Sequence, residues 1–170
     1  FGEDFSNLAQ VMKEEGLVDR KICIVTDSNV GPLYEESVKQ VLSEVSSDIS
    51  VFTFEAGEKN KNLNTVSALY QALIQNGLDR KSLLVALGGG VVGDLTGFGA
   101  ATYLRGIDFI QVPTTLLAQV DSSVGGKTGV DFQQYKNMVG AFHQPRLVYM
   151  NLSTLSSLPA EQFACGMGEI

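Results

Sequence analysis

Three glycines at a fixed spacing are the clearest chemical signal in this sequence. Gly88, Gly90 and Gly93 fit the pattern G-x-G-x-x-G, where an apolar run ends and a helical pattern begins. Glycines there let the backbone approach a pyrophosphate, whose charge is favoured at a helix N-terminus. They would equally suit a tight turn, and the acidic strand end that usually follows about 20 residues later is absent. Asp27 or Glu58, at the ends of other predicted strands, could bind the ribose instead.

A second glycine-rich stretch, residues 121–128, ends like a P-loop. Asp121 stands where that pattern needs its first glycine, so we exclude a P-loop NTPase. Lys127 follows two glycines, and it can still bind phosphate through its ammonium and the neighbouring amides. A surface lysine in a flexible turn explains this stretch equally well.

Further cationic and amide side chains lie close by in the sequence. Arg105, Lys127 and Lys136 are three cations in a region otherwise poor in charge, and Asn137 adds an amide. Each alone is more often a solvated side chain, but together they indicate an anion pocket.

The sequence pattern alone gives weaker evidence of a catalytic or binding role for His143 and Glu169. His143 is the only histidine, and its place near Pro145 fits a structural role better than a catalytic one. Glu169 lies off the apolar stripe of a helix predicted to begin at Pro159, as a solvated acid would. That helix has a start signal and no stop signal, so we expect a further domain or partner beyond Ile170.

The elements that must position these residues alternate apolar strands with amphipathic helices. We expect strands at 21–26, 49–54, 82–88 and 107–113, helices at 32–46, 63–76 and 91–102, and short strands near 124–130 and 147–151 within a less regular region. This alternation predicts an α/β fold with an open, doubly wound, mainly parallel sheet. Ligands bind such sheets beyond the carboxyl ends of the strands. Those ends are Asp27, the loop 57–61, Gly88–Gly90 and Pro113–Thr115, which we expect on one rim.

Composition and charge exclude several classes of protein. The 170 residues carry 12 Lys and Arg against 19 Asp and Glu, a formal net charge of −7, which argues against a nucleic-acid partner. Residues 1–60 hold 12 acids and 5 bases, whereas residues 61–170 hold seven of each, so an anionic ligand is expected in the later part. No apolar stretch approaches the ~18 residues of a membrane span. Two cysteines make no disulfide framework, so we expect a cytoplasmic protein with Cys23 as a core thiol.

Three blocks of the sequence closely resemble the 3-dehydroquinate synthase family. They are GGGVVGDLTGFGAATYLRG (88–106), VPTTLLAQVDSSVGGKTGVD (112–131) and KNMVGAFHQP (136–145). The resemblance, which runs from about residue 21 to the end, implies a Rossmann-like NAD-binding domain over 1–158. Residues 159–170 would begin the first helix of an all-helical C-terminal domain that is absent here. It also implies a homodimeric shikimate-pathway enzyme that converts the seven-carbon keto-sugar acid phosphate DAHP to 3-dehydroquinate, using NAD and a divalent metal, zinc or cobalt.

The resemblance further implies a role for individual residues. Those that would bind the cofactor are Asp27, Glu58, Lys61, Gly89, Gly90, Asp94, Thr114, Thr115, Lys127, Lys136 and Ser157. Those that would contact the substrate or its phosphate are Arg105, Asp121, Lys127, Lys136 and Asn137. Glu169 matches a metal ligand of the family, which replaces the interpretation as a solvated acid. The two histidine ligands of the metal would lie beyond Ile170, and His143 matches a non-ligand position.

The chemistry implied by the resemblance is a redox-assisted elimination and ring closure. NAD oxidises a ring hydroxyl, phosphate leaves and can act as its own base, NADH returns the hydride, and ring opening with aldol closure gives the carbocycle. Asp121 would then orient hydroxyl groups. We expect the 170-residue chain to be inactive alone, because one carboxylate cannot replace the three protein ligands of a catalytic zinc.

Three alternatives remain open. A sister sugar-phosphate cyclase, of the 2-deoxy-scyllo-inosose or 2-epi-5-epi-valiolone synthase type, would act on glucose 6-phosphate or sedoheptulose 7-phosphate. A metal-dependent polyol dehydrogenase would release NADH stoichiometrically. A non-catalytic dinucleotide-binding module would bind NAD and gain nothing from a helical second half.

Overall fold

Four parallel strands form the centre of the fold. The computed structural model describes residues 4–119, 126–151 and 153–154. The strands lie in the order β2-β1-β3-β4, and they are β1 (Ile22–Asp27), β2 (Ile49–Phe54), β3 (Leu83–Gly88) and β4 (Asp108–Pro113). The chain runs outward from β1 to β2 and then returns to the other side of β1 to form β3. Such a switch point leaves a crevice beyond the carboxyl ends of the two strands, which here are Asp27 and Gly88.

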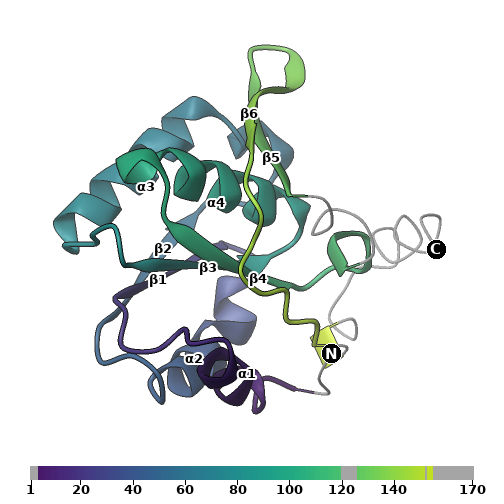
Figure 1. Ribbon diagram of the computed structural model, residues 1–170. Helices are drawn as coiled ribbons and strands as arrows, with labels where there is room; N and C mark the ends of the chain where they lie inside the picture. Colours follow the sequence, from purple (N-terminus) through teal and green to yellow (C-terminus); the bar gives the residue numbers. More distant parts are fainter. Residues whose placement is uncertain (1–3, 120–125, 152, 155–170) are drawn as a thin grey trace.

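Helices cover both faces of this sheet. α1 (Leu8–Glu14) and α2 (Gly31–Leu42) pack on one face, and α3 (Leu63–Gln75) and α4 (Gly90–Thr102) on the other (Figure 1). Alternate side chains of one strand serve the two cores: Ile24 packs toward α1 and α2, and Val25 toward α3 and α4. Every residue of β3 is buried, as expected of a central parallel strand. The predicted α/β fold, doubly wound and Rossmann-like, is confirmed.

Most helix limits follow local signals in the sequence. α3 begins after Asn62, whose Oδ1 accepts a hydrogen bond from the Thr65 N–H at 3.0 Å, a normal N-cap. α2 has Pro32 in its first turn but ends at Leu42, four residues before the predicted end. The chain turns there because the Ser46 hydroxyl donates a hydrogen bond to the Arg20 carbonyl at 2.6 Å, which draws it back to the start of β1.

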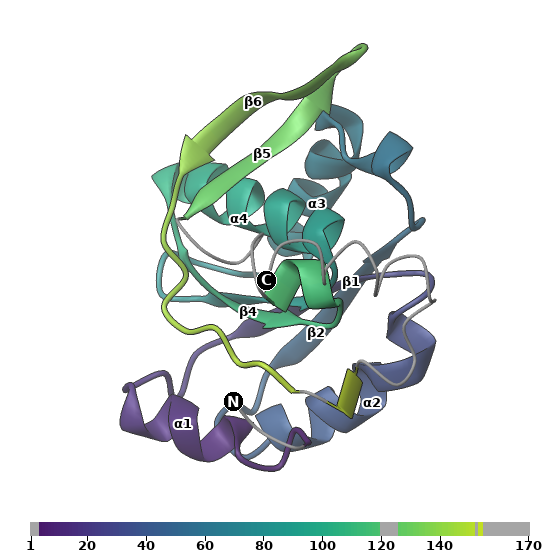
Figure 2. The ribbon, with the colours of Figure 1, turned by 90° about the vertical axis from the view of Figure 1, so that its right-hand side faces the viewer.

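A β-hairpin lies on the side of α4 away from the sheet (Figure 2). It consists of β5 (Lys127–Phe132) and β6 (Tyr135–Phe142), which pair antiparallel. A Cβ atom on Gly97 of α4 would overlap Thr128 of β5, so the glycine permits this close packing. β5 overlaps the short strand predicted near 124–130, whereas β6 was not predicted, because it is mostly exposed and lacks an apolar alternation. The strand predicted near 147–151 is reduced to isolated bridge residues at Val148, which pairs with Gln111, and at Asn151.

The smaller elements complete the description. The sequence analysis did not predict α1, nor the short 3₁₀ turns η1 (Glu58–Asn60) and η2 (Tyr103–Arg105). Cys23 is a core thiol as predicted, and burial raises its pKa to about 11. In the part of the chain that the structure describes, every helix is too short or too polar to span a bilayer.

Candidate functional site

The glycine turn joins the end of β3 to the start of α4. The Thr114 N–H donates a hydrogen bond to the Gly88 carbonyl at 2.9 Å, so the end of β4 lies beside this turn. A Cβ on Gly89 would lie 2.9 Å from the Thr115 Cγ2, closer than side chains tolerate. Among the residues that the structure describes, no side chain caps the N-terminus of α4, so backbone N–H groups there are open to a ligand. The turn can therefore hold an anionic group against bare backbone.

Asp27 lies across the switch point from this turn, at the end of β1. Its Oδ1 accepts hydrogen bonds from the backbone N–H groups of Asn29 at 3.0 Å and Val30 at 2.9 Å. These bonds fix the carboxylate, and Oδ2 makes no hydrogen bond to any residue that the structure describes. A fixed carboxylate with one oxygen available suits the hydroxyl groups of a ribose.

Lys61 is the centre of an ionic cluster. Its side chain is only 4% exposed. The distances from Nζ are 2.8 Å to Asn137 Oδ1, 3.2 Å to Asp94 Oδ2, 3.3 Å to Glu58 Oε1 and 3.9 Å to Asp131 Oδ1. One buried ammonium therefore joins η1, α4 and the hairpin.

The pKa shifts within this cluster follow from burial and from the charges of one cation and three carboxylates. Burial lowers the pKa of Lys61, but Asp94 and Glu58 outweigh burial and the net pKa is raised. Burial raises the pKa of Asp94 to about 6; Lys61 opposes this shift, while Glu58 and Asp131 add to it. For Lys61 the charges of Asp94 and Glu58 outweigh burial, whereas for Asp94 burial is the largest cause and outweighs the opposing charge of Lys61. Lys61 is therefore charged at neutral pH. Asp94, with a pKa of about 6, changes its protonation state slightly below neutral pH.

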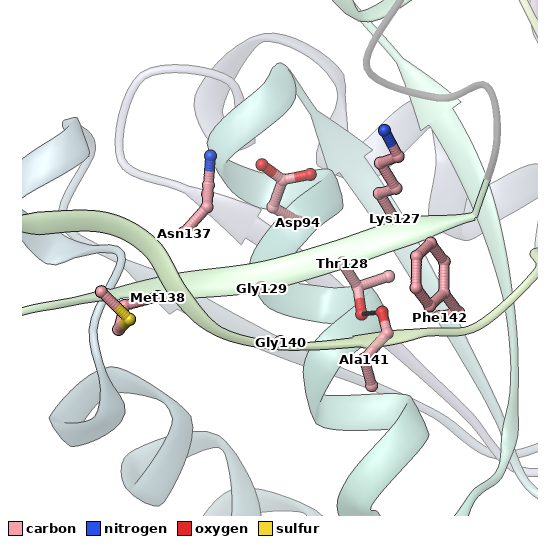
Figure 3. A pocket seen from close by; sticks show the side chains of 9 residues that line it. All are labelled: Asp94, Lys127, Thr128, Gly129, Asn137, Met138, Gly140, Ala141 and Phe142. Atoms are coloured by element: carbon pink, nitrogen blue, oxygen red, sulfur yellow. Dashed lines mark hydrogen bonds between the residues drawn. The ribbon is translucent and has the colours of Figure 1, made fainter.

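A pocket of about 410 Å³ opens between the hairpin and the first turns of α4. The residues that line it are Asp94, Lys127, Thr128, Gly129, Asn137, Met138, Gly140, Ala141 and Phe142. The side chains of Lys127 and Asn137 on the hairpin and of Asp94 on α4 point in the same direction (Figure 3). Lys127 makes no ion pair and no side-chain hydrogen bond with the described residues. Because Asn137 Oδ1 accepts from Lys61, its Nδ2 can donate, so the pocket offers a cation and an amide donor to an anion.

The structure brings most of the predicted site residues to two adjoining places. The residues at or behind the pocket are Glu58, Lys61, Asp94, Lys127 and Asn137, with Lys136 exposed on β6 beside Asn137. The residues at the strand ends are Asp27, Gly89, Gly90, Thr114 and Thr115. Arg105 lies in η2, after the last turn of α4, with φ 67°, and it does not line the pocket. The predictions for Asp121, Ser157, Glu169 and the helix from Pro159 lie outside the described residues.

Sequence reasoning missed residues of the pocket and of the ionic cluster. Met138 and Phe142 in the pocket and Asp131 in the cluster gave no signal, because their pattern shows neither periodicity nor a motif spacing. His143 has the structural role that was predicted: its Nε2 lies 2.8 Å from the Ile107 carbonyl oxygen. Among the described residues, no group of three His, Cys, Asp or Glu side chains could hold a metal ion.

Comparison with known proteins places these features in a family. The family model described as 3-dehydroquinate synthase, N-terminal, matches residues 51–165, which is more than half of the chain. The chain belongs to the 3-dehydroquinate synthase family. The synthase of Symbiobacterium thermophilum is 56% identical over 151 residues, which are 89% of this chain and 42% of the relative. The synthase of Acetivibrio thermocellus is 48% identical over 167 residues, 98% of this chain and 46% of the relative. The chain thus spans less than half the length of these two synthases.

Solved structures of sugar-phosphate cyclases have the same fold. A 2-deoxy-scyllo-inosose synthase complexed with carbaglucose-6-phosphate, NAD⁺ and Co²⁺ superposes with a TM-score of 0.89 at 32% identity, over 98% of this chain and 45% of that one. The 2-epi-5-epi-valiolone synthase of Streptomyces hygroscopicus, with NAD⁺ and Zn²⁺ bound, gives 0.84 at 29% identity, over 94% of this chain and 45% of that one. The described fold of this 3-dehydroquinate synthase family member is therefore shared with a part of such a cyclase, which makes up less than half of its length.

Proposed function

We propose that this chain supplies the NAD-binding half of a 3-dehydroquinate synthase, a lyase that converts DAHP to 3-dehydroquinate and phosphate. One observation carries the proposal. Asp94, one turn of α4 beyond the glycine turn, lines the same pocket as Lys127 and Asn137 of the hairpin. A dinucleotide at the turn would therefore lie next to an anionic substrate in the pocket.

NAD fits the residues at the strand ends. The backbone of Gly89 and Gly90 and the N-terminus of α4 would bind the pyrophosphate. Asp27 Oδ2 would accept hydrogen bonds from ribose hydroxyls, across the switch point. When bound, NAD would supply a hydride acceptor and later return the hydride. Thr114 and Thr115 would border the cofactor at the end of β4.

The pocket residues would bind and orient the substrate. Lys127 and the Asn137 Nδ2 would hold the phosphate of DAHP, exchanging its water for fixed donors. Lys136, exposed beside them, adds a second cation. Asp94 would carry a proton part of the time near pH 6, and it could accept a hydrogen bond from a substrate hydroxyl when ionised. Arg105 and Asp121 complete the proposed substrate set.

A divalent metal belongs to the same proposal. The two cyclase neighbours contain Co²⁺ or Zn²⁺, and Glu169 is the ligand that this chain would contribute. Catalytic zinc takes three protein ligands, so the other half of the enzyme must supply the rest. We propose that the chain alone is inactive, and that the whole protein is a cytoplasmic homodimer.

A chimera tests this function. We would join the chain to the C-terminal half of the Symbiobacterium thermophilum synthase and assay DAHP, glucose 6-phosphate and sedoheptulose 7-phosphate with NAD⁺ and Zn²⁺. We expect phosphate and 3-dehydroquinate from DAHP alone, with no net NADH. Lys127→Met should raise KM for DAHP by at least about tenfold, because a charged contact to phosphate is lost. Lys59→Met, an exposed lysine 77% accessible, should leave KM unchanged.

Each of the other outcomes identifies a different function. Stoichiometric NADH would indicate a polyol dehydrogenase, and turnover of glucose 6-phosphate or sedoheptulose 7-phosphate would indicate a sister cyclase. Titration of the chain itself with NAD⁺, by calorimetry, keeps the proposal testable if the chimera does not fold. A folded chain that binds no NAD⁺ would contradict the proposal.

A further inference from the structure

The strand pairing of the hairpin is irregular at Lys136 and Asn137, two of the predicted site residues. The flanking pairs are Val130 with Val139 and Phe132 with Tyr135. Asp131 of β5 alone therefore faces residues 136–138 of β6, which include Lys136 and Asn137. An insertion of this kind is a β-bulge, which interrupts the backbone ladder and redirects side chains, often beside active sites. Something must replace the missing ladder bonds if the bulge is to keep one conformation.

Asp131 makes the hydrogen bonds that replace the missing ladder bonds. Its Oδ1 accepts a hydrogen bond from the Asn137 N–H at 2.8 Å, and its own N–H donates to the Lys61 carbonyl at 2.8 Å. The same Oδ1 lies 3.9 Å from Lys61 Nζ, and the side chain is only 15% exposed. The Asp131 carboxylate thus contacts both the backbone of the bulge and the ammonium of Lys61.

The bulge gives Asn137 a backbone conformation that few residues adopt. Its φ is 53°, in the left-handed region, which Asn tolerates better than other residues with a side chain. In this conformation its Oδ1 lies 2.8 Å from Lys61 Nζ, and the side chain lines the pocket.

The charge of Asp131 offers a competing explanation, in which the carboxylate only balances Lys61. Burial raises the pKa of Asp131, but the hydrogen bonds with the Asn137 N–H and with Glu58 and the charges of Lys61 and Lys136 outweigh it, and the net pKa is lowered. The carboxylate is therefore ionised at neutral pH. Asn at position 131 separates the two explanations, because it keeps an acceptor oxygen and loses the charge.

We propose that Asp131 is a positioning residue: by accepting the Asn137 N–H bond it holds the 136–138 bulge and so fixes Asn137 and Lys61 at the pocket. Its benefit to substrate binding rests on the proposed function, whereas its effect on the bulge does not. The proposal therefore needs one measurement of the bulge and another of the pocket.

The first measurement is hydrogen exchange of the Asn137 amide by NMR, in this chain. Asp131→Ala should speed that exchange by about tenfold, as expected when a hydrogen bond to a charged group is lost. Asp131→Asn should stay within about threefold of the wild type because an acceptor remains. Gln134→Ala, at an exposed residue of the same hairpin turn, should change nothing. Unchanged exchange in Asp131→Ala overturns the proposal, and so does an equal acceleration in Asp131→Asn, which would assign the effect to charge.

The second measurement is the affinity of the chain for inorganic phosphate, followed through the Lys127 and Asn137 amide shifts. Asp131→Ala should weaken it by about tenfold, and Asp131→Asn should restore most of it. If phosphate binds equally well to wild type and Asp131→Ala, the positioning role is overturned while the proposed function stands. If the wild type binds no phosphate, the proposed pocket fails, and the exchange result alone decides the role of Asp131.

Discussion

The four-stranded sheet and the β5–β6 hairpin are stabilised in different ways. Every residue of β3 is buried, and apolar side chains fill both faces of the sheet. The hairpin buries Val130 against the α3 and α4 side, but Met138 and Phe142 on β6 are 56% and 82% exposed. Val139 and Ala141 of β6 pack in part against the same core, and Thr128 of β5 packs closely on Gly97. The hairpin is further attached through the buried Lys61 and its carboxylate partners. The scaffold thus depends on hydrophobic burial, whereas the position of the pocket depends on charged contacts as well as on packing.

The largest expected effect is on the sheet. Leu84→Ala removes a fully buried side chain of β3, and it should lower the free energy of unfolding by about 3–5 kcal/mol. Ile74→Ala, on α3 and 66% exposed, should change it by less than about 0.5 kcal/mol. Urea denaturation measures both. Hydrogen exchange should accelerate equally in β3 and in the hairpin of Leu84→Ala, because both would exchange through global unfolding. Acceleration confined to the hairpin would contradict the conclusion that burial of side chains such as Leu84 stabilises the sheet.

The second effect should be local to the hairpin. Lys61→Met leaves three carboxylates without their buried cation, which costs about 3 kcal/mol in comparable cases. We expect amide exchange to accelerate in residues 127–142 far more than in β3. Lys59→Met is the matched control, because Lys59 is 77% exposed and pairs only with Glu55 at 4.0 Å, which is worth less than about 1 kcal/mol. Equal exchange in the two variants would mean that the ionic cluster does not hold the hairpin.

The smallest of the three effects depends on pH. The pKa of Asp94 is raised from 3.8 to about 6, so between these values the folded state holds more of the proton than the unfolded state. The stability contributed by this group is fully present below about pH 4 and is lost as the pH rises through 6. Relative to Asp94→Asn, the wild-type free energy of unfolding should fall by ~2 kcal/mol between about pH 4 and 7.

Asp131→Asn provides a control of opposite sign. The pKa of Asp131 is lowered, so its carboxylate stabilises the fold above its usual pKa, and that benefit is lost as the pH falls through the folded-state value. The difference from wild type should therefore grow with rising pH, at the acid end of the range. Denaturation curves at several pH values measure both variants. A difference between wild type and Asp94→Asn that does not change with pH would show that Asp94 is not buried in this cluster as described.

The sequence by itself determined the sheet and the glycine turn. Apolar strand runs such as 82–88 and amphipathic helices such as 63–76 are local patterns, and each needs only its own period to be recognised. The turn at Gly88–Gly90 follows directly from its place between a strand and a helix. The resemblance to the synthase family predicted further site residues, such as Lys61 and Asn137, but not the residues that they contact.

Only the tertiary structure decided how the pocket is built. Lys61 and Asn137 are 76 residues apart in the chain, and their contact exists because the hairpin folds back over α4. Asp131 gave no signal, since its function lies in a bulge that pairing with β6 creates. Local patterns report which face of an element is buried, but a contact between two polar side chains from distant elements has no period. It is set by packing, here by the close approach of Thr128 to Gly97.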